Sequence, residues 1–505
     1  MLRRTSLAAA ALLATGALLL TACSAAEAPA PTTSAVADPD ASVAVRLVSE
    51  PGNLDIRETA GAALDQLLID NVYQGLVSRT PEQDIVPALA SDYEVSPDGL
   101  TYTFTLREGV VFHDGQPLTP QDVIWSLTQV RDTASYRDSA RLAGVTGITA
   151  NGQDIVLTLA EPDSSLLWNL TGRAGLILKE GDTTDRKTAA NGTGPFTLAS
   201  WKQGDSVTLA RFADYWGDPA GAAEVVFAYI PETQAALNAA LAGEVDVVTG
   251  FDANLTEQIE ANGDFTVEIG ASTDKGTLAM NAGEGPLADV KVRQAIRQAI
   301  DHDAIVEALG AGQTMYGPIP ELDPGYEDLS ELVPHDPEAA RELLAEAGYD
   351  EGDDLELTLT LPSFYGTTVS QILVSNLHDV GITLKVNAVE FSSWLNDVYM
   401  NRDYELSFVL HTEAHDFENW ANPEYYFAYD DAEVQELFAQ SLAATDEAEA
   451  ADLLAEAARI VSEDHAADWL YNGASVVAVG ANITGMPTVN VNERLNLVEL
   501  TKSEG

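Results

Sequence analysis

The segment from His411 to Asp416 combines two histidines with two carboxylates, all of them side chains that can bind a cation. If the segment is extended, side chains two positions apart point to the same side, so His411, Glu413 and His415 would lie together. Two imidazoles and one carboxylate are a ligand set that suits Ni(II), Zn(II) or Fe(II). Two histidines at this spacing also arise by chance in 505 residues, so metal binding is one alternative for this segment.

A second pattern, Ser272 followed by Lys275, matches the Ser-x-x-Lys arrangement in which penicillin-recognising enzymes use the serine as nucleophile. The Ser-Asp-Asn that such enzymes also need is absent from the sequence, and the nearby triplet is Lys-Gly-Thr rather than Lys-Thr-Gly. The sequence has no Gly-x-Ser-x-Gly, no His-Glu-x-x-His and no phosphate-binding glycine loop. We therefore expect no enzyme activity, no catalytic residues and no cofactor, and we interpret Lys275-Gly276 as a hinge that leads into a strand at Thr277.

The charge of the chain excludes two classes of partner. It has 80 acidic and 25 basic residues, a formal net charge of −55. A nucleic-acid-binding surface needs basic groups to replace phosphate counterions, and adhesion to an anionic membrane needs a polybasic patch. With 46% hydrophobic residues, the chain can still bury a large core. We expect a folded, acidic protein that binds no nucleic acid.

The N-terminus has the pattern of a bacterial lipoprotein. Arg3 and Arg4 precede an apolar run over residues 7–20, which is short for a membrane span and typical of a signal peptide. The following Leu20-Thr21-Ala22-Cys23 resembles a lipobox, which implies cleavage after residue 22 and lipidation of Cys23. Residues 23–42 are small, polar and proline-rich, so we expect a flexible tether. Cys23 is the single cysteine, which excludes a disulfide within the chain.

Strand and helix patterns alternate along the remainder of the chain, which predicts an α/β fold. Residues 96–99 predict the turn of a hairpin, and Thr119 with Pro120 predicts the start of a helix. The other predicted helices span residues 289–309, 337–348 and 445–464. The other predicted strands span residues 43–49, 154–159, 207–211, 224–230, 355–361, 382–389 and 404–410.

Several segments occur in the order in which one family of receptors carries its motifs. They are residues 51–55, 71–76, 87–90, 96–123, 192–196, 214–216, 243–246 and 292–301. The run from Ser96 to Val123 is the most specific of them. With these motifs, residues 43–500 resemble the family 5 extracellular solute-binding proteins, the peptide- and nickel-binding receptors of ABC importers. Ile56 departs from the proline that the family has after its Leu-Asp pair.

That resemblance implies an α/β fold of two lobes that close on a ligand like a hinged clamp, with an extra subdomain inserted in the first lobe. The first lobe would comprise residues 43–250 and 475–505, with the inserted subdomain at about 56–185. The second lobe would comprise residues 275–470. The hinge would lie at residues 248–275 and 468–476.

The resemblance also suggests ligand-binding residues. In dipeptide and oligopeptide receptors, an aspartate after a strand pairs with the α-ammonium of the peptide. Aligning Asp416 to Asn419 with the family's Asp-Pro-Asp-Asn pattern places Glu413 at that position, one methylene longer, and a plain surface glutamate is the alternative. Asp416, His411, His415 and the nearby Trp420 are further candidate contacts, although an aromatic residue here is equally compatible with a core position.

No residue matches the arginine that binds the ligand carboxylate in dipeptide receptors, because Tyr365 stands near that position. Arg173 is a candidate substitute, with an exposed or ion-paired arginine as the alternative. Long peptides held through main-chain hydrogen bonds would not need such a cation.

Together these observations predict a monomeric, lipid-anchored receptor on the extracytoplasmic face of a bacterial cell membrane. It would capture peptides and deliver them to an ABC importer made of two permease subunits and their ATPases. A receptor for nickel or a metal chelate, with His411, Glu413 and His415 as ligands, is the alternative in the same class.

Overall fold

The computed structural model describes residues 37–283, 285–349 and 355–504, and they belong to one compact unit, residues 37–505. The predicted signal peptide and Cys23 lie outside the described residues. The end of the predicted tether already contacts the folded body, because Ala37 pairs with Ser503 and the Asp38 N–H donates to the carbonyl of Lys502.

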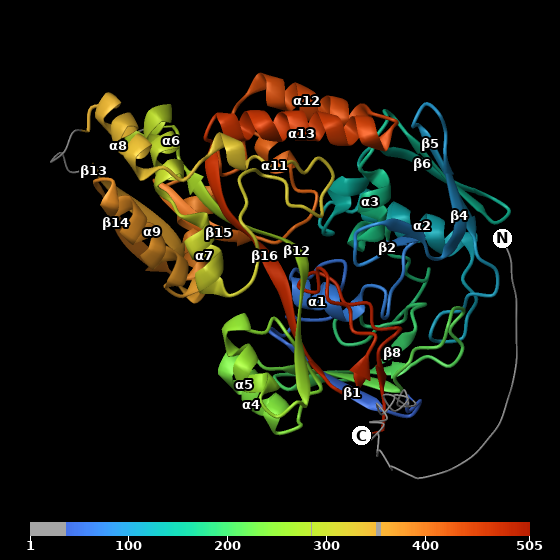
Figure 1. Cartoon of the computed structure of the whole chain (residues 1–505). Helices are drawn as coiled ribbons and strands as arrows, with labels where there is room; N and C mark the ends of the chain where they lie inside the picture. Colours follow the sequence, from blue (N-terminus) through green and yellow to red (C-terminus); the bar gives the residue numbers. More distant parts are fainter. Residues whose placement is uncertain (1–36, 284, 350–354, 505) are drawn as a thin grey trace, which may run out of the picture. The chain divides into compact units, whose positions relative to one another are not determined.

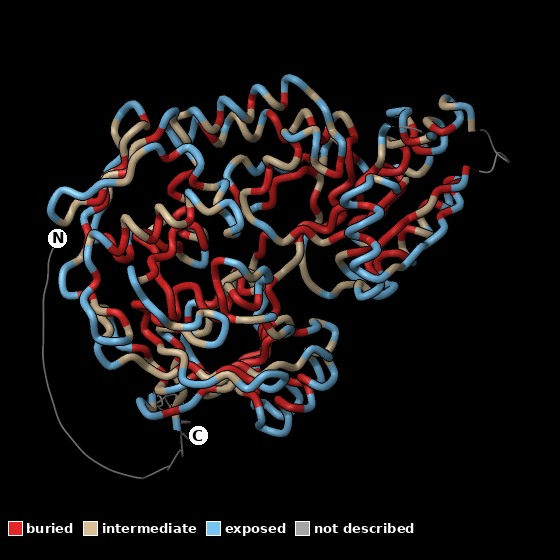
Figure 2. The backbone as a smooth tube through the Cα atoms, turned by 180° about the vertical axis from the view of Figure 1, so that it is seen from behind, coloured by how far each residue is buried: buried red, intermediate tan, exposed pale blue. Residues whose placement is uncertain are grey.

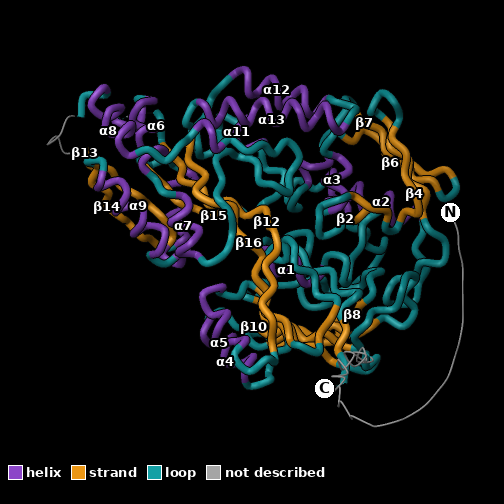
Figure 3. Tube along the Cα trace, in the orientation of Figure 1, coloured by secondary structure: helices purple, strands orange, loops and turns teal. Residues whose placement is uncertain are grey.

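A ten-stranded mixed sheet connects the elements (Figures 1 and 3). Its order is β14 (Ile382–Val389), β13 (Leu355–Pro362), β15 (Leu406–His411), β12 (Phe265–Met280), β16 (Ala467–Gly480), β11 (Val247–Thr249), β1 (Ser42–Leu47), β10 (Glu224–Tyr229), β9 (Ser206–Arg211) and β8 (Phe196–Lys202). β13 is parallel to β14 and β15, and β1 is parallel to β10 and β11. The strands come from both ends of the chain, so the sheet is assembled by contacts distant in sequence.

Two long antiparallel strands, β12 and β16, connect two groups of elements, which are described in turn below (Figure 1). Their pairing shifts register between Ala271 and Lys275 and again at Gly276. A Cβ at position 276 would lie 2.4 Å from the ring of Tyr471, so only glycine fits there. Bulges bend and twist strands. The first shift lies at the end of the predicted hinge segment 248–275, and the second lies just beyond it. The hinge itself remains a prediction.

The first group of elements packs on one side of this irregularity. It contains β1 and β8 to β11 with α4 (Thr233–Leu241) and α5 (Thr256–Glu260), and the short strands β17 (Ile483–Thr484) and β18 (Thr501–Lys502). Its core includes Val45, Phe227 and Val477, all with no exposed surface.

Residues 56–185, the predicted insertion, hold a core of their own between Leu76 and Ile177. α1 (Ala62–Leu68) instead packs in the core of the first group, and the bounds of the insertion remain a prediction. A four-stranded sheet has the order β4 (Ala90–Val95), β5 (Thr101–Leu106), β7 (Asp154–Leu159) and β6 (Val145–Asn151). α2 (Pro120–Asp132), α3 (Leu166–Thr171) and the strand pair β2 (Val77–Arg79) and β3 (Ile85–Pro87) complete it. The predicted start of α2 is confirmed, because Thr119 and Asp122 form a capping box.

The second group surrounds β13 to β15. Its helices are α6 (Val290–Ala299), α7 (His302–Leu309), α8 (Pro337–Glu346), α9 (Thr368–Asp379), α10 (Phe391–Trp394), α11 (Glu418–Ala421), α12 (Ala432–Ala443) and α13 (Glu447–Glu463). The prediction of a single helix over residues 289–309 is wrong at its centre. Ile300 is extended, and the Asp301 side chain accepts from the Ala304 N–H, so a new helix begins there.

A buried ion pair ties this second group to the long strand β16. The Arg297 guanidinium on α6 lies 3.2 Å from Asp468 on β16, and both side chains have no exposed surface. His302 Nε2 lies 3.0 Å from the other Asp468 oxygen. Arg297 also donates to the Ser462 carbonyl at the end of α13. Each charge therefore has partners, as burial of charge demands.

The α/β class predicted from the sequence is confirmed. Figure 2 shows buried residues along the strands of the large sheet and exposed residues on the outer helices. Among the described residues, no helix combines the length and apolar character needed to cross a bilayer.

Candidate functional site

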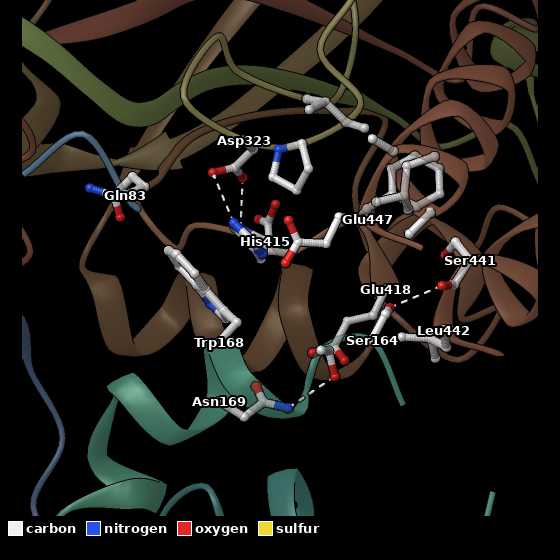
Figure 4. Close-up of a pocket in the computed structure, with 18 of the residues that line it drawn as sticks. Gln83, Ser164, Trp168, Asn169, Asp323, His415, Glu418, Ser441, Leu442 and Glu447 are labelled. Atoms are coloured by element: carbon white, nitrogen blue, oxygen red, sulfur yellow. Dashed lines mark hydrogen bonds and ion pairs between the residues drawn. The ribbon is translucent and has the colours of Figure 1, made fainter. Parts of the chain in front are cut away.

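A cavity of about 1020 Å³ lies where the inserted segment 56–185 meets the second group of elements (Figure 4). This volume is at the upper end of the range of ligand-binding pockets. From the inserted segment, its lining includes residues 82–85, Tyr93, Asp138, Ala140, Arg141, 163–165, Trp168 and Asn169. From the second group, it includes residues 318–319, 322–324, 415–418, Phe438, 441–442, Glu447, 450–451 and Leu454.

Direct contacts join the two sides of this cavity. Arg141 lies 2.8 Å from the Glu418 carboxylate. The Ser164 N–H donates to the Leu442 carbonyl at 2.8 Å, and the Ser164 hydroxyl donates to the Ser441 carbonyl at 2.9 Å. The ion pair is solvent-exposed and contributes little by itself. The structure thus represents a conformation in which the two sides touch.

An aromatic stack forms part of the wall. Trp168 on α3 lies parallel to the imidazole of His415, with ring centroids 3.5 Å apart, and the Arg79 guanidinium lies 4.2 Å from the same indole. Burial, with the nearby cations Arg79, Lys275 and Arg141, lowers the pKa of His415. The imidazole is therefore neutral at pH 7.

Beside the cavity, a buried ammonium is surrounded by acids. Lys275 on β12 is 3% exposed, and its Nζ donates to the carbonyls of Thr273 (3.1 Å) and Glu413 (2.6 Å). The same Nζ lies 3.2 Å from Asp416 Oδ1. Burial by itself would lower the pKa of Lys275, but Asp416 and Asp323 outweigh it and raise the pKa above its usual value. Lys275 is therefore charged.

Asp323 lines the cavity next to this ammonium and is 6% exposed. Its Oδ2 accepts the backbone N–H of His415 at 2.6 Å, while its Oδ1 has no hydrogen-bond partner and lies 4.0 Å from His415 Nε2 (Figure 4). Burial raises the pKa of Asp323 to about 7, although Lys275 acts in the opposite direction. Asp274 is a second buried acid of the cluster, and burial raises its pKa to about 6.

Sequence reasoning did not find Asp323 or Trp168. Asp323 lies in a loop between Pro320 and Pro324, where an acid usually marks only a turn. Trp168 looks like an ordinary core residue of a short apolar helix.

Glu413 has an exposed carboxylate that makes no ion pair or hydrogen bond with any described side chain or backbone group. The ligand atoms of His411, Glu413 and Asp416 lie within 4.8 Å of one another. His415 is not part of this group. The prediction that His411, Glu413 and His415 share a face is wrong, because β15 ends at His411 and His415 adopts a φ of 54°.

Of the remaining predicted residues, Arg173 is not available to a ligand carboxylate. It is buried and binds Asp65 through two nitrogens, at 2.5 and 2.9 Å, and it also donates to the carbonyls of Thr59 and Gly61. Its interpretation as a carboxylate-binding cation is therefore wrong, and the ion-paired alternative is correct.

Trp420 and Tyr365 do not line the cavity. Trp420 is buried and stacks on Phe427, with centroids 4.0 Å apart, so it is a core residue. The Tyr365 hydroxyl accepts the backbone N–H of Leu410 at 3.0 Å. Of the predicted ligand contacts, the structure brings His415 and Asp416 to the cavity.

The Ser-x-x-Lys pattern lies within β12 and is buried. The Ser272 hydroxyl donates to the Gly473 carbonyl at 2.9 Å, across the pairing of β12 with β16. The Lys275 ammonium is directed to acids and carbonyls, as described above. Both side chains therefore have structural partners in this strand pair.

Among curated proteins, the chain is 30% identical to heme-binding protein A of Haemophilus influenzae over 316 residues, which cover 56% of this chain and 57% of the relative. It is 29% identical to the glutathione-binding protein GsiB of Pectobacterium atrosepticum, covering 66% of each chain. It is 30% identical to protein XP55 of Streptomyces lividans, covering 70% of this chain and 67% of the relative. The chain thus spans under two thirds of the length of the first two relatives.

Solved structures share the fold. The DppA periplasmic binding protein of Helicobacter pylori, in complex with the peptide STSA, superposes with a TM-score of 0.78 at 24% identity, covering 92% of this chain and 98% of that one. NikA of Brucella suis, in complex with Fe(III)-EDTA, gives a TM-score of 0.82 at 21% identity, covering 92% and 100%. The predicted fold class, a two-lobed binding-protein clamp, is confirmed by these matches. Residues 84–433 match the sequence profile of the bacterial extracellular solute-binding proteins, family 5, middle region, and the chain belongs to that family.

Proposed function

We propose that this protein is the substrate-binding receptor of an ABC importer and that it captures peptides. The observation that carries the proposal is the cavity between residues 56–185 and the second group of elements, which has the volume of a ligand pocket and is lined from both sides. The relative named as a glutathione-binding protein supports a peptide-like ligand, since glutathione is a tripeptide.

The mechanism is a shift of population between open and closed forms. A ligand that contacts both sides of the cavity stabilises the form in which they touch, and the permease recognises that form. Two permease subunits with their ATPases are the partners. The receptor works as a monomer on the extracytoplasmic face of the cell membrane, held there by lipid on Cys23.

Glu413 is the residue we propose for the α-ammonium of the peptide. Its carboxylate is exposed and makes no ion pair within the described part of the chain, so it is available to a ligand. It does not line the cavity itself, but it lies three residues before Asp416, which does. An α-ammonium at Glu413 would let the rest of the peptide enter the cavity.

Calorimetry with alanine peptides of three to six residues tests the proposal. Free-amine peptides should bind, and N-acetylated ones should bind more weakly. Glu413→Gln should weaken binding of free-amine peptides by about fivefold, the upper end of what an exposed ion pair contributes. Glu82→Gln is the matched control, because Glu82 is an exposed glutamate at the edge of the same cavity.

Two results would contradict the peptide proposal. One is the absence of binding by every peptide at millimolar concentration. The other is native mass spectrometry of the purified protein that shows a retained ligand of another class.

A receptor for a metal or metal chelate is the second candidate, and the group of His411, Glu413 and Asp416 favours it. The Lys275 ammonium, 3.2 Å from Asp416, opposes a cation at this position. His411→Ala should leave peptide affinity nearly unchanged if peptides are the ligand. Stoichiometric nickel or zinc in the purified protein, lost in His411→Ala, would favour the metal candidate instead.

A further inference from the structure

The acidic cluster beside the cavity has more negative than positive groups. We define the cluster as Lys275 with the carboxylates that its charge acts on, which are those of Asp416, Asp323, Asp274 and Glu413. Asp416 is closest to the ammonium, at 3.2 Å. One ammonium carries less charge than these acids together, and burial raises the pKa of Asp323 and of Asp274.

Asp323 lines the cavity and also holds a buried carboxylate oxygen that has no hydrogen-bond partner. The residue is 6% exposed, and the unpaired oxygen is Oδ1. Its other oxygen is fixed by the backbone N–H of His415 at 2.6 Å, so the side chain is held in place. A buried, unpaired carboxylate oxygen costs free energy that a ligand donor would recover.

The rest of the lining is compatible with a basic side chain. Arg141 is the single arginine or lysine among the described lining residues, and it is already paired with Glu418. The exposed acids of the lining, such as Glu82 and Asp138, are weak evidence for a basic ligand, because the whole chain is acidic. Apolar residues of the lining offer contacts for the methylene groups of a long side chain. They include Ile319, Leu322, Phe438 and Leu454.

We propose that Asp323 binds the basic side chain of the ligand, so that the cavity selects peptides that contain lysine or arginine. This inference rests on the proposed function for the peptide part of the ligand. The ammonium or guanidinium of the ligand side chain would donate to Asp323 Oδ1. The α-ammonium of the ligand would bind Glu413. Lys275 keeps its own three contacts and is not displaced.

The test compares the peptide Ala-Lys-Ala with Ala-norleucine-Ala, in which the side chain keeps its length and loses its charge. Calorimetry on the wild-type protein should show at least tenfold tighter binding of the lysine peptide, about the effect of one charge-assisted hydrogen bond. Asp323→Asn should reduce this preference to within about twofold. Agmatine, a guanidinium without a peptide bond, is the third probe.

Asp138→Asn is the matched control. Asp138 is an exposed aspartate that lines the same cavity, and asparagine suits its left-handed backbone (φ 61°). This variant should keep the preference for lysine at 150 mM salt, because rim charges are screened. Loss of the preference in Asp138→Asn as well as in Asp323→Asn would assign it to the general negative field and overturn the inference.

A measurement on the wild type covers the case in which Asp323→Asn does not fold. At pH 7 the lysine peptide should release about half a proton from Asp323 on binding, whereas the norleucine peptide should release none. Calorimetry in two buffers of different ionisation enthalpy measures this. The other charged groups that act on Asp323 are Lys275, Asp416 and Glu493, and His415 adds a backbone N–H.

The results separate the inference from the proposed function. Equal binding of the two peptides overturns the role of Asp323 and leaves the peptide receptor standing. Binding of agmatine that depends on Asp323, without binding of any peptide, supports the role of Asp323 and removes the peptide proposal. Binding of none of the three probes at millimolar concentration contradicts both.

Discussion

The indole of Trp168 and the imidazole of His415 lie parallel, with centroids 3.5 Å apart and ring planes 4° apart. The two residues are separated by almost half of the chain and come from opposite sides of the cavity (Figure 4). Their stack links the inserted segment to the segment that follows β15. The contact therefore exists only when the two sides touch, and its removal should shift the balance towards an open form.

Trp168→Ala should increase the radius of gyration of the ligand-free protein in small-angle scattering. The stack contributes about 0.5–1.5 kcal/mol beyond simple burial, enough to change the ratio of two nearly balanced conformations. Trp168→Phe is the control, because it keeps a ring against His415. Saturating ligand should return Trp168→Ala to the compact radius. An unchanged radius for Trp168→Ala, with and without ligand, would show that this contact does not report closure.

Asp468→Ala should strongly destabilise the second group of elements. It leaves the buried Arg297 without its charge partner, and removing one partner of a buried pair costs about 3–5 kcal/mol of the free energy of unfolding. Urea denaturation measures the loss. The exposed pair of Arg459 and Glu327 provides the comparison, since Arg459→Ala should cost less than about 1 kcal/mol. Equal losses of the free energy of unfolding in the two variants would mean that burial does not strengthen the contribution of the Asp468 pair to stability.

Asp323 should make the stability of the protein fall with rising pH. Its pKa is about 7 in the folded chain, above the value near 3.9 of an unfolded aspartate. A raised folded pKa gives stability that is fully present below the unfolded pKa and lost as the pH rises through the folded pKa. The charged groups that act on Asp323, which are Lys275, Asp416 and Glu493, are present in both the wild type and Asp323→Asn, so the comparison isolates Asp323. Between pH 5 and pH 8, the wild type should lose about 2 kcal/mol more than Asp323→Asn. Parallel stability curves, measured by urea denaturation, would contradict this.

Cys23→Ser should abolish both lipid labelling and signal-peptide cleavage in a bacterial host. The thiol is the acyl acceptor in the predicted lipobox, and stable anchoring needs more than one acyl chain. Radiolabelled palmitate and intact mass report the two steps. Ser24→Ala, one residue further on, should be processed and lipidated normally. A processed wild-type protein without lipid would remove the anchor from the proposal.

Local rules were sufficient for many elements. The pair Thr119–Pro120 begins α2 as predicted, and α8 begins at the predicted Pro337, because a cap and the first turn involve only neighbouring residues. The strand patterns of residues 355–361 and 382–389 correspond to β13 and β14 for the same reason. The motif order was enough for the family, whose profile covers residues 84–433.

Local rules failed where the chain changes direction. Alternation in an extended chain predicted that His411, Glu413 and His415 share a face, but β15 ends at His411 and the following backbone turns. The helix predicted over residues 289–309 is interrupted because the Asp301 side chain caps a second helix. Hydrophobic periodicity does not reveal such a break, since both helices keep an apolar face towards the same core.

The sequence by itself determined the α/β class, the starts of the few helices with clear capping signals, the acidic character of the protein and its family. The tertiary structure decided which acids matter. Arg173 became the partner of Asp65, and Lys275 became the partner of Asp416. Asp323 came to the cavity wall with one oxygen unpaired. These outcomes depend on contacts between residues about a hundred or more positions apart, and desolvation there sets the charge of each group, which no local pattern contains.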